Sequence, residues 1–389
     1  MHLRFFRRGG IVFVFLLYTV TVAQAQVSDS TAVADSLLIQ DLARELGPAE
    51  TTANPTPVGS VTRNAPTLNP NISMIGDFRA MYQSDVARNV DAQLHEAEMG
   101  LQSVVDPYAR ADFFISAAPD ENGDIQFELE EAYLTSLSLP HQLQLKAGKF
   151  RSSFGKINMI HPHALPFIDI PAVYVNYFGE DGLNDQGVSL SWLLPNSHFF
   201  QDLTVQVTRG PVGGVGVYTH DNGNQLLYVA HLKNFWDLSE NATIELGFSG
   251  AAGPNELGRT NWLGGIDFTY KWKPLQFNTY RSFTLQVETF FNRKNVGPDA
   301  RINTFGMYAL ASYSLGRRWL VVGRFDHSDL PDNPSWNENG FSTTLGFRTT
   351  EFQKIELGVR TSSAQGFDQR YQAILRAVFV IGAHGAHAY

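Results

Sequence analysis

The sequence of 389 residues contains no cysteine, which excludes disulfide bonds, thiolate catalysis, cysteine metal ligands and a cysteine-linked lipid anchor. Beyond residue 25 it has no apolar run of about 18 residues, the length that a membrane-spanning helix requires. Positive charge is the minority charge, with 29 Lys and Arg residues against 38 Asp and Glu residues and a net charge of −9. This acidic balance argues against nucleic acid as a partner.

Residues 1–25 are predicted to be a secretory signal peptide. Arg4, Arg7 and Arg8 form a basic start, residues 11–22 form an apolar core too short to span a bilayer, and residues 23–25 (Ala-Gln-Ala) form a cleavage site. A membrane anchor is the alternative. Cleavage removes three arginines and moves the net charge from −9 to −12.

Residues 26–70 differ in composition from the rest of the chain and are predicted to be a periplasmic segment. Residues 35–46 have leucines at helical spacing and are expected to form a short amphipathic helix. The residues after it are rich in Pro, Thr and Asn and are expected to form an extended linker. Plain disorder of residues 26–70 is the alternative.

From residue 71 to the last residue, runs of about ten residues alternate apolar and polar side chains, as Ile244, Leu246 and Phe248 show with their polar neighbours. This period of two predicts an all-β fold, a transmembrane antiparallel β-barrel of about 16 strands over residues 71–389. Short turns alternate with longer loops, which is typical of outer-membrane barrels. The predicted strands cover residues 72–83, 93–105, 108–118, 125–138, 142–151, 186–194, 201–210, 224–236, 241–252, 261–273, 281–293, 303–315, 317–328, 339–350, 352–363 and 367–381.

The apolar set of each strand is expected to face lipid. Aromatic residues such as Trp262 and Trp319 lie near predicted strand ends, where barrels carry aromatic belts at the membrane interfaces. A soluble β-sandwich also has one apolar face and is the alternative. The uniform strand length and the charges at mid-strand on the polar face favour the barrel, with outer-membrane lipid as a partner.

The polar set of each strand is expected to line a water-filled channel, because sixteen strands enclose a lumen. The predicted basic residues of the channel wall, Arg79, Arg324, Arg348, Arg360 and Arg376, would form a column once the first strand lies beside the last. The predicted acidic residues further around are Glu245, Asp267 and Glu288, and Glu96, Glu98, Glu128 and Glu130 also point inward.

The longest loop, residues 152–186, is predicted to be the third extracellular loop and to fold inward. Its Asp169 would then oppose the arginine column across a narrow constriction, and the resulting field would select and orient ionic solutes. The alternative is that the charges solvate the lumen and pair with their neighbours.

His161 and His163 in the same loop are candidate metal ligands together with Asp169, because imidazole and carboxylate groups suit zinc. Pro162 between them directs the two rings apart unless the chain turns there. The alternative is ordinary hydrogen bonding of the histidines within the loop. Apart from this zinc site, no cofactor is expected.

Four segments carry a resemblance to a known family: HEAEMGLQSVVDPYARADFF, ELEEAYLTSLSLP, LKAGKFRSSFGKINMIHPHALPF and FGEDGLNDQGVSLSWLLP. Together they resemble a porin-like family of Gram-negative outer-membrane β-barrels, distantly like the phosphate-selective porins. Its members are often labelled zinc-regulated TonB-dependent outer-membrane receptors. The resemblance covers about residues 70–389 and implies an outer-membrane location and a porin-like barrel.

The leading functional prediction is a porin that allows passive diffusion of small hydrophilic, ionic solutes. The first alternative is a zinc or other metal-ion uptake channel or receptor that uses the loop with His161 and His163. The others are an outer-membrane enzyme such as a lipase, disfavoured because no nucleophile motif surrounds Ser152 or Ser153, and a structural or adhesive barrel with a blocked lumen. A homotrimer stays open as an assembly.

Overall fold

The computed structural model describes residues 70–86, 90–120, 122–196, 198–211, 216–219, 225–277 and 281–382. The predicted signal peptide and all but the last residue of the predicted periplasmic segment lie outside these residues, so both stay predictions. In the described part of the chain, no helix has the length and apolar character needed to cross a membrane.

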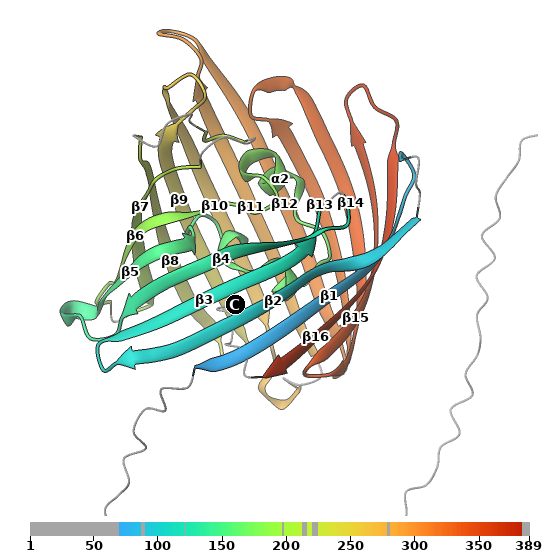
Figure 1. The fold of residues 1–389 in the computed structure, drawn as a ribbon, viewed down its shortest axis with the longest axis horizontal. Coiled ribbons are helices and arrows are strands. Elements are labelled where there is room, and N and C mark those ends of the chain that lie inside the picture. Colours follow the sequence, from blue (N-terminus) through green and yellow to red (C-terminus); the bar gives the residue numbers. More distant parts are fainter. Residues whose placement is uncertain are drawn as a thin grey trace, which may run out of the picture. The chain divides into compact units, whose positions relative to one another are not determined.

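The described residues form sixteen β-strands, and each strand pairs in antiparallel fashion with the strands before and after it. β1 pairs with β16, which closes the sheet into a barrel (Figure 1). The predicted 16-stranded antiparallel barrel is confirmed, and each observed strand overlaps its predicted range. The strands are β1 (Asn71–Gln83), β2 (Val90–Asp106), β3 (Ala109–Pro119), β4 (Ile125–Ser136), β5 (Leu143–Arg151), β6 (Asn184–Leu193), β7 (Phe200–Thr208), β8 (Leu227–Ser239), β9 (Ala242–Pro254), β10 (Thr260–Trp272), β11 (Arg281–Asn295), β12 (Arg301–Leu315), β13 (Trp319–Leu330), β14 (Asn333–Thr350), β15 (Gln353–Ala364) and β16 (Arg370–Gly382).

The alternating pattern places apolar side chains on the outer surface of the barrel. Trp262 on β10 and Phe291 on β11 are 58% and 52% exposed, whereas Asp267 and Glu288 on the same two strands are paired in register and buried. In a soluble sandwich the apolar set would be buried between two sheets, so that alternative is wrong. An outward apolar surface is the one that a barrel presents to lipid.

A long segment, residues 152–183, connects β5 to β6 and is named the bridging segment here. It contains two 3-10 turns, η2 (Ile157–Met159) and η3 (Pro162–Ala164), and one helix, α2 (Ala172–Phe178). Two further 3-10 turns lie elsewhere, η1 (Pro140–Gln142) and η4 (Leu275–Phe277). Hydrogen bonds tie the bridging segment to inward-facing side chains of β2, β4, β7, β9, β11, β12, β13, β15 and β16. The segment therefore crosses the interior of the barrel, where Figure 1 shows α2.

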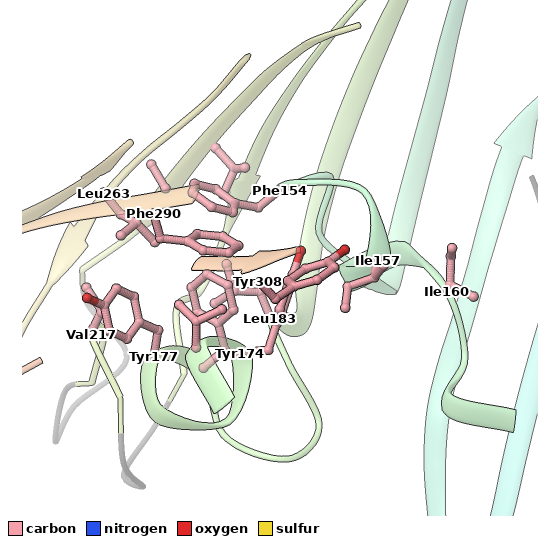
Figure 2. Packing of buried hydrophobic residues seen from close by; sticks show 14 of the residues in the cluster. Phe154, Ile157, Ile160, Tyr174, Tyr177, Leu183, Val217, Leu263, Phe290 and Tyr308 are labelled. Carbon is pink, nitrogen blue, oxygen red and sulfur yellow. The ribbon is translucent and has the colours of Figure 1, made fainter. Parts of the chain in front are cut away.

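Aromatic side chains hold the bridging segment in place. The ring of Phe154 stacks on Phe290 of β11 at 5.5 Å, and Tyr174 of α2 meets the same ring edge-on at 5.1 Å (Figure 2). Inward-facing apolar side chains of the wall complete the cluster, among them Leu263, Leu310 and Val322. Burying each large apolar side chain contributes about 1.5–3 kcal/mol. The expectation of a water-filled interior is therefore wrong where the bridging segment crosses the barrel. There, inward-facing apolar residues of the wall pack against apolar residues of the segment.

Two glycines of the wall make room for this cluster. A Cβ atom on Gly306 of β12 would lie 2.3 Å from Cγ2 of Val173 in α2, and one on Gly265 of β10 would lie 3.0 Å from the ring of Phe154. Any larger residue at Gly306 would displace α2 from the wall. The close packing of the segment thus depends on the absence of a side chain at these positions.

Candidate functional site

The predicted basic column is present, but its central members are ion-paired. Arg324 of β13 donates to Asp169 at 2.7 Å and to Asp326 at 3.0 Å, and its guanidinium lies 4.7 Å from the ring of Phe167. Arg360 of β15 donates to the same Asp169 carboxylate at 3.2 Å. Asp169 therefore touches the column, whereas the sequence analysis placed it across an open constriction.

Arg376 and Arg79 are also ion-paired, and they lie where β16 pairs with β1. Arg376 of β16 contacts Asp77 at 3.0 Å and Glu356 at 3.4 Å, and it also donates to the backbone carbonyl of Pro162 in the bridging segment. Arg79 of β1 contacts the same Asp77 at 2.8 Å. Each of these arginines has an acidic partner on its own or a neighbouring strand.

These contacts correct the prediction that the arginines line open water. Arg324 and Arg376 have no exposed side-chain surface, because the bridging segment covers them. Arg79 and Arg360 are about 15% exposed. Only Arg348, of the five predicted residues, is exposed, and it lines a cavity described below. The alternative, in which the charged side chains pair with their neighbours, holds for the other four arginines.

The predicted acidic residues are also covered by the bridging segment. Glu288 accepts hydrogen bonds from the backbone N–H of Lys156 at 3.0 Å, from Tyr174 at 2.6 Å and from Tyr308. Glu245 pairs with the Lys156 ammonium at 2.6 Å. Asp267 is buried beside them on β10. Glu245 and Glu288 thus hold the segment at Lys156 and Tyr174, and the arginines hold it at Pro162 and Asp169.

The two histidines lie close together, but without Asp169. Pro162 begins the turn η3, and this turn brings the rings of His161 and His163 to a centroid distance of 5.6 Å. The carboxylate next to both is Glu98 of β2, at 2.8 Å from Nδ1 of His161 and 3.4 Å from Nδ1 of His163. The predicted grouping with Asp169 is therefore wrong, because the two arginines engage that residue.

Glu131 of β4 is a site residue that the sequence analysis missed. Its carboxylate lies 2.8 Å from Nε2 of His161, while the neighbouring Glu130 lies 3.2 Å from Nδ1. Alternation predicts that only one of two consecutive residues faces inward. The register between β3 and β4 shifts at Phe114 and Ile115, and this irregularity turns both carboxylates inward.

Two titratable groups of the bridging segment respond to these partners. Burial opposes the charged form of Asp169, but Arg324 and Arg360 outweigh it and hold the pKa of the carboxyl below its ordinary value. Burial likewise disfavours the imidazolium of His161, but the carboxylates of Glu130, Glu131 and Glu98 raise its pKa well above the ordinary value. Both groups are therefore charged at neutral pH in the structure as it stands.

A cavity of about 1310 Å³ lies inside the barrel at the rim of the short turns. The bridging segment lines it with residues including Lys156, Ile160 and His163. Eight of its lining residues are basic and three are acidic, an excess of five positive charges. The basic ones are Lys156, Lys271, Lys273, Arg281, Arg317, Arg318, Arg348 and Lys354, and the acidic ones are Glu245, Glu351 and Glu356.

The closed 16-stranded antiparallel barrel is the fold of outer-membrane porins. Three solved structures share it. An anion-selective porin from Comamonas acidovorans has a TM-score of 0.56 and 10% identity, over 80% of this chain and 99% of that one. The outer membrane channel DcaP of Acinetobacter baumannii has a TM-score of 0.55 and 10% identity, over 80% and 97%. OmpT of Vibrio cholerae, in its trimer form, has a TM-score of 0.53 and 9% identity, over 80% and 100%.

The chain belongs to the same family as an uncharacterized protein of Aquifex aeolicus. The two sequences are 30% identical over an alignment of 342 positions, and the match covers 76% of this chain and 70% of that protein. No protein-family model matches the chain.

Proposed function

We propose that this protein is an outer-membrane porin that allows passive diffusion of small hydrophilic solutes and favours anions. The observation that carries the proposal is the basic cavity inside a closed barrel whose outer surface is apolar. The apolar outer surface fits contact with outer-membrane lipid. The closed sheet also fits a lipid environment, because a barrel satisfies its backbone hydrogen bonds between its own strands.

The preference for anions follows from the charges of the cavity. Five excess positive charges lie within walls of low dielectric constant, where field lines are focused and the local concentration of anions rises. The bridging segment forms the inner limit of the cavity and is the constriction in this proposal. Selection then depends on the cavity charge, whereas the sequence analysis attributed it to an open arginine column. The structural neighbour from Comamonas acidovorans is an anion-selective porin, which is consistent with this view.

Planar-bilayer recordings test the proposal directly. The purified protein should give single-channel conductance, and a salt gradient should give a reversal potential of the sign expected for anion preference. Arg318→Glu combined with Arg348→Glu removes four positive charge equivalents from the cavity and should shift the preference towards cations. Arg293→Glu combined with Arg301→Glu makes the same charge change on exposed residues outside the cavity lining and is the matched control.

The outcomes distinguish the remaining candidates. An absence of conductance would contradict the porin proposal and favour a structural or adhesive barrel with a blocked lumen. An equal shift in both double variants would show that overall charge, and not the cavity, sets the preference. An enzyme that uses Ser152 or Ser153 as its nucleophile is disfavoured, because both ring nitrogens of His161 face carboxylates and a serine nucleophile needs a free histidine base within hydrogen-bond reach.

Metal uptake and TonB-dependent transport fit the geometry less well. His161 and His163 are 2% and 4% exposed, so they suit a static site better than a transport path. TonB-type transporters are barrels of about 22 strands with a separate plug, whereas this barrel has sixteen strands in its described residues.

A homotrimer is the assembly we propose to test first, because one structural neighbour is described in a trimer form. Chemical cross-linking of the protein in detergent should give a band of three chains. A monomer at every protein concentration would remove this part of the proposal and leave the diffusion channel untouched.

A further inference from the structure

We propose that His161, His163 and Glu98, together with Glu96 and Glu130, bind one divalent transition-metal ion that fixes the bridging segment to β2 and β4. One ligand atom each from Glu98, His161 and His163 lies within 4.8 Å of the other two. The same holds for Glu96, Glu98 and Glu130, so Glu98 belongs to both groups. The two groups therefore share the Glu98 carboxylate, and Glu130 also lies 3.2 Å from Nδ1 of His161.

The spacing of the donor atoms suits a metal ion. Donors in a tetrahedral zinc site lie about 2.0–2.2 Å from the metal, and hence roughly 3.3 Å from one another. The Glu98 carboxylate lies 2.8 Å from Nδ1 of His161 and 3.4 Å from Nδ1 of His163. Both separations lie within about 0.5 Å of the value that a tetrahedral site requires. Imidazole with carboxylate favours zinc and related transition metals over calcium or magnesium, which prefer oxygen ligands alone.

The charge of the cluster would also be balanced by one divalent cation in place of protons. Four carboxylates gather here, from Glu96, Glu98, Glu130 and Glu131. The positive groups that act on them, apart from the histidines, are Arg151, which pairs with Glu130 at 3.3 Å, and Lys146 on the side of Glu131. With both imidazoles neutral, as metal ligation requires, two negative charges remain, which one divalent ion would balance.

A buried acceptor points to the same position. Glu98 is 2% exposed, and its Oε1 atom has no hydrogen-bond partner among the described residues, although Oε2 accepts from His161. A buried carboxylate oxygen without a partner is costly, and a bound cation removes that cost. His163 also lines the cavity at the short-turn rim, so the proposed site borders this open space.

The proposed ion would act as a structural anchor. The turn η3 carries both histidines, and its Pro162 carbonyl accepts a hydrogen bond from Arg376 of β16. Metal binding would attach this turn to β2 and β4, in addition to its hydrogen bond with Arg376 of β16. Binding itself does not depend on the transport function, so the two proposals can fail separately.

The test uses the full chain purified in detergent, stripped with EDTA and titrated with Zn²⁺. We expect about one equivalent of zinc per chain by elemental analysis, and a higher unfolding temperature in the zinc-loaded protein than in the stripped protein. Glu98→Gln and His163→Ala should each lose the bound zinc and the temperature shift. His231→Ala removes another buried histidine of the same barrel and should keep both.

Three results would overturn the proposal. The first is no bound zinc in the wild-type protein, in which case a shared proton balances the carboxylates. The second is equal zinc binding in the wild type and both cluster variants, which would show adventitious binding elsewhere. The third is an equal temperature shift with Ca²⁺, which would contradict the assignment to transition metals. Circular dichroism of each variant verifies that the barrel is folded, so that loss of zinc is not loss of structure.

Discussion

At the scale of single residues, Asp169 has a larger part than its position in a loop suggests. Its carboxylate joins arginines of β13 and β15, and its backbone carbonyl accepts a further hydrogen bond from Arg324 at 2.6 Å. Arg324 is fully buried, and a buried guanidinium that loses a partner is costly. Asp169 thus connects the bridging segment to the wall and also neutralises charge that the segment covers.

Asp169→Asn keeps the size of the side chain and removes its charge. We expect it to lower the unfolding free energy by about 3 kcal/mol, because Arg324 and Arg360 lose a shared anionic partner. The control is Asp181→Asn, the same change at an exposed position of the same segment. Urea unfolding in detergent compares the two variants, and equal stability would contradict the anchoring role.

The pH dependence of this pair has a definite sign. Since the pKa of Asp169 is held below its ordinary value of 3.8, the ion pairs stabilise the fold above that value and are lost as pH falls through the depressed pKa. The contribution of this pair should therefore be constant from about pH 8 to pH 5 and disappear only below about pH 4. Thermal unfolding of the wild type should show this loss, and Asp169→Asn should show less of it.

At the scale of elements, the strands and the bridging segment differ in how far the sequence predicts them. A strand is visible in sequence because its side chains alternate, as Ile244, Leu246 and Phe248 do. The contacts of the bridging segment are decided by where a chain of more than thirty residues turns, which alternation does not encode. The sequence therefore predicts His161 and His163 as candidate ligands, but it groups them with Asp169, whereas the carboxylate beside both is that of Glu98. It also does not predict Glu131, because a local irregularity of β4 breaks the period of two.

The fit of α2 against the wall can be tested at one glycine. Gly306→Ala places a methyl group in contact with Val173 and should destabilise the protein by about 1–3 kcal/mol, because the core is overpacked. Gly323→Ala on the neighbouring strand β13 meets no atom of the described residues within 4 Å and is the control. Trypsin cleavage after Lys156 should accelerate in Gly306→Ala alone. Equal cleavage in both variants would show that α2 is not held by this contact.

At the scale of the whole molecule, the barrel separates an apolar outside from a charged inside. Leu345, Leu357 and Leu375 are register partners on β14, β15 and β16 and are all exposed on the outer surface. On the inner face, β15 and β16 carry the paired Arg360 and Arg376. The alternating sequence pattern predicts which side chains face outward and which face inward, because successive residues of a strand point to opposite faces of the sheet.

Placing a charge on the outer surface tests the position in lipid. Leu375→Arg at mid-strand should destabilise the protein in lipid bilayers by about 2–4 kcal/mol, whereas a charge near the membrane interface costs about 0–1 kcal/mol. Leu315→Arg, at an exposed strand end, is the control. Refolding titrations into vesicles measure both. A protein that stays dissolved and folded without detergent, or equal costs at the two positions, would contradict a lipid-facing surface.

The seam between the first and last strands has a consequence for assembly. Arg376 sits opposite Arg79 where β16 meets β1, and the same guanidinium holds Pro162 of the bridging segment. Closure of the barrel between β1 and β16 and docking of the bridging segment therefore both involve Arg376. If the bridging segment is misplaced, Arg376 lacks the Pro162 carbonyl as a partner where β1 and β16 meet. Closure of such a barrel is therefore less favourable.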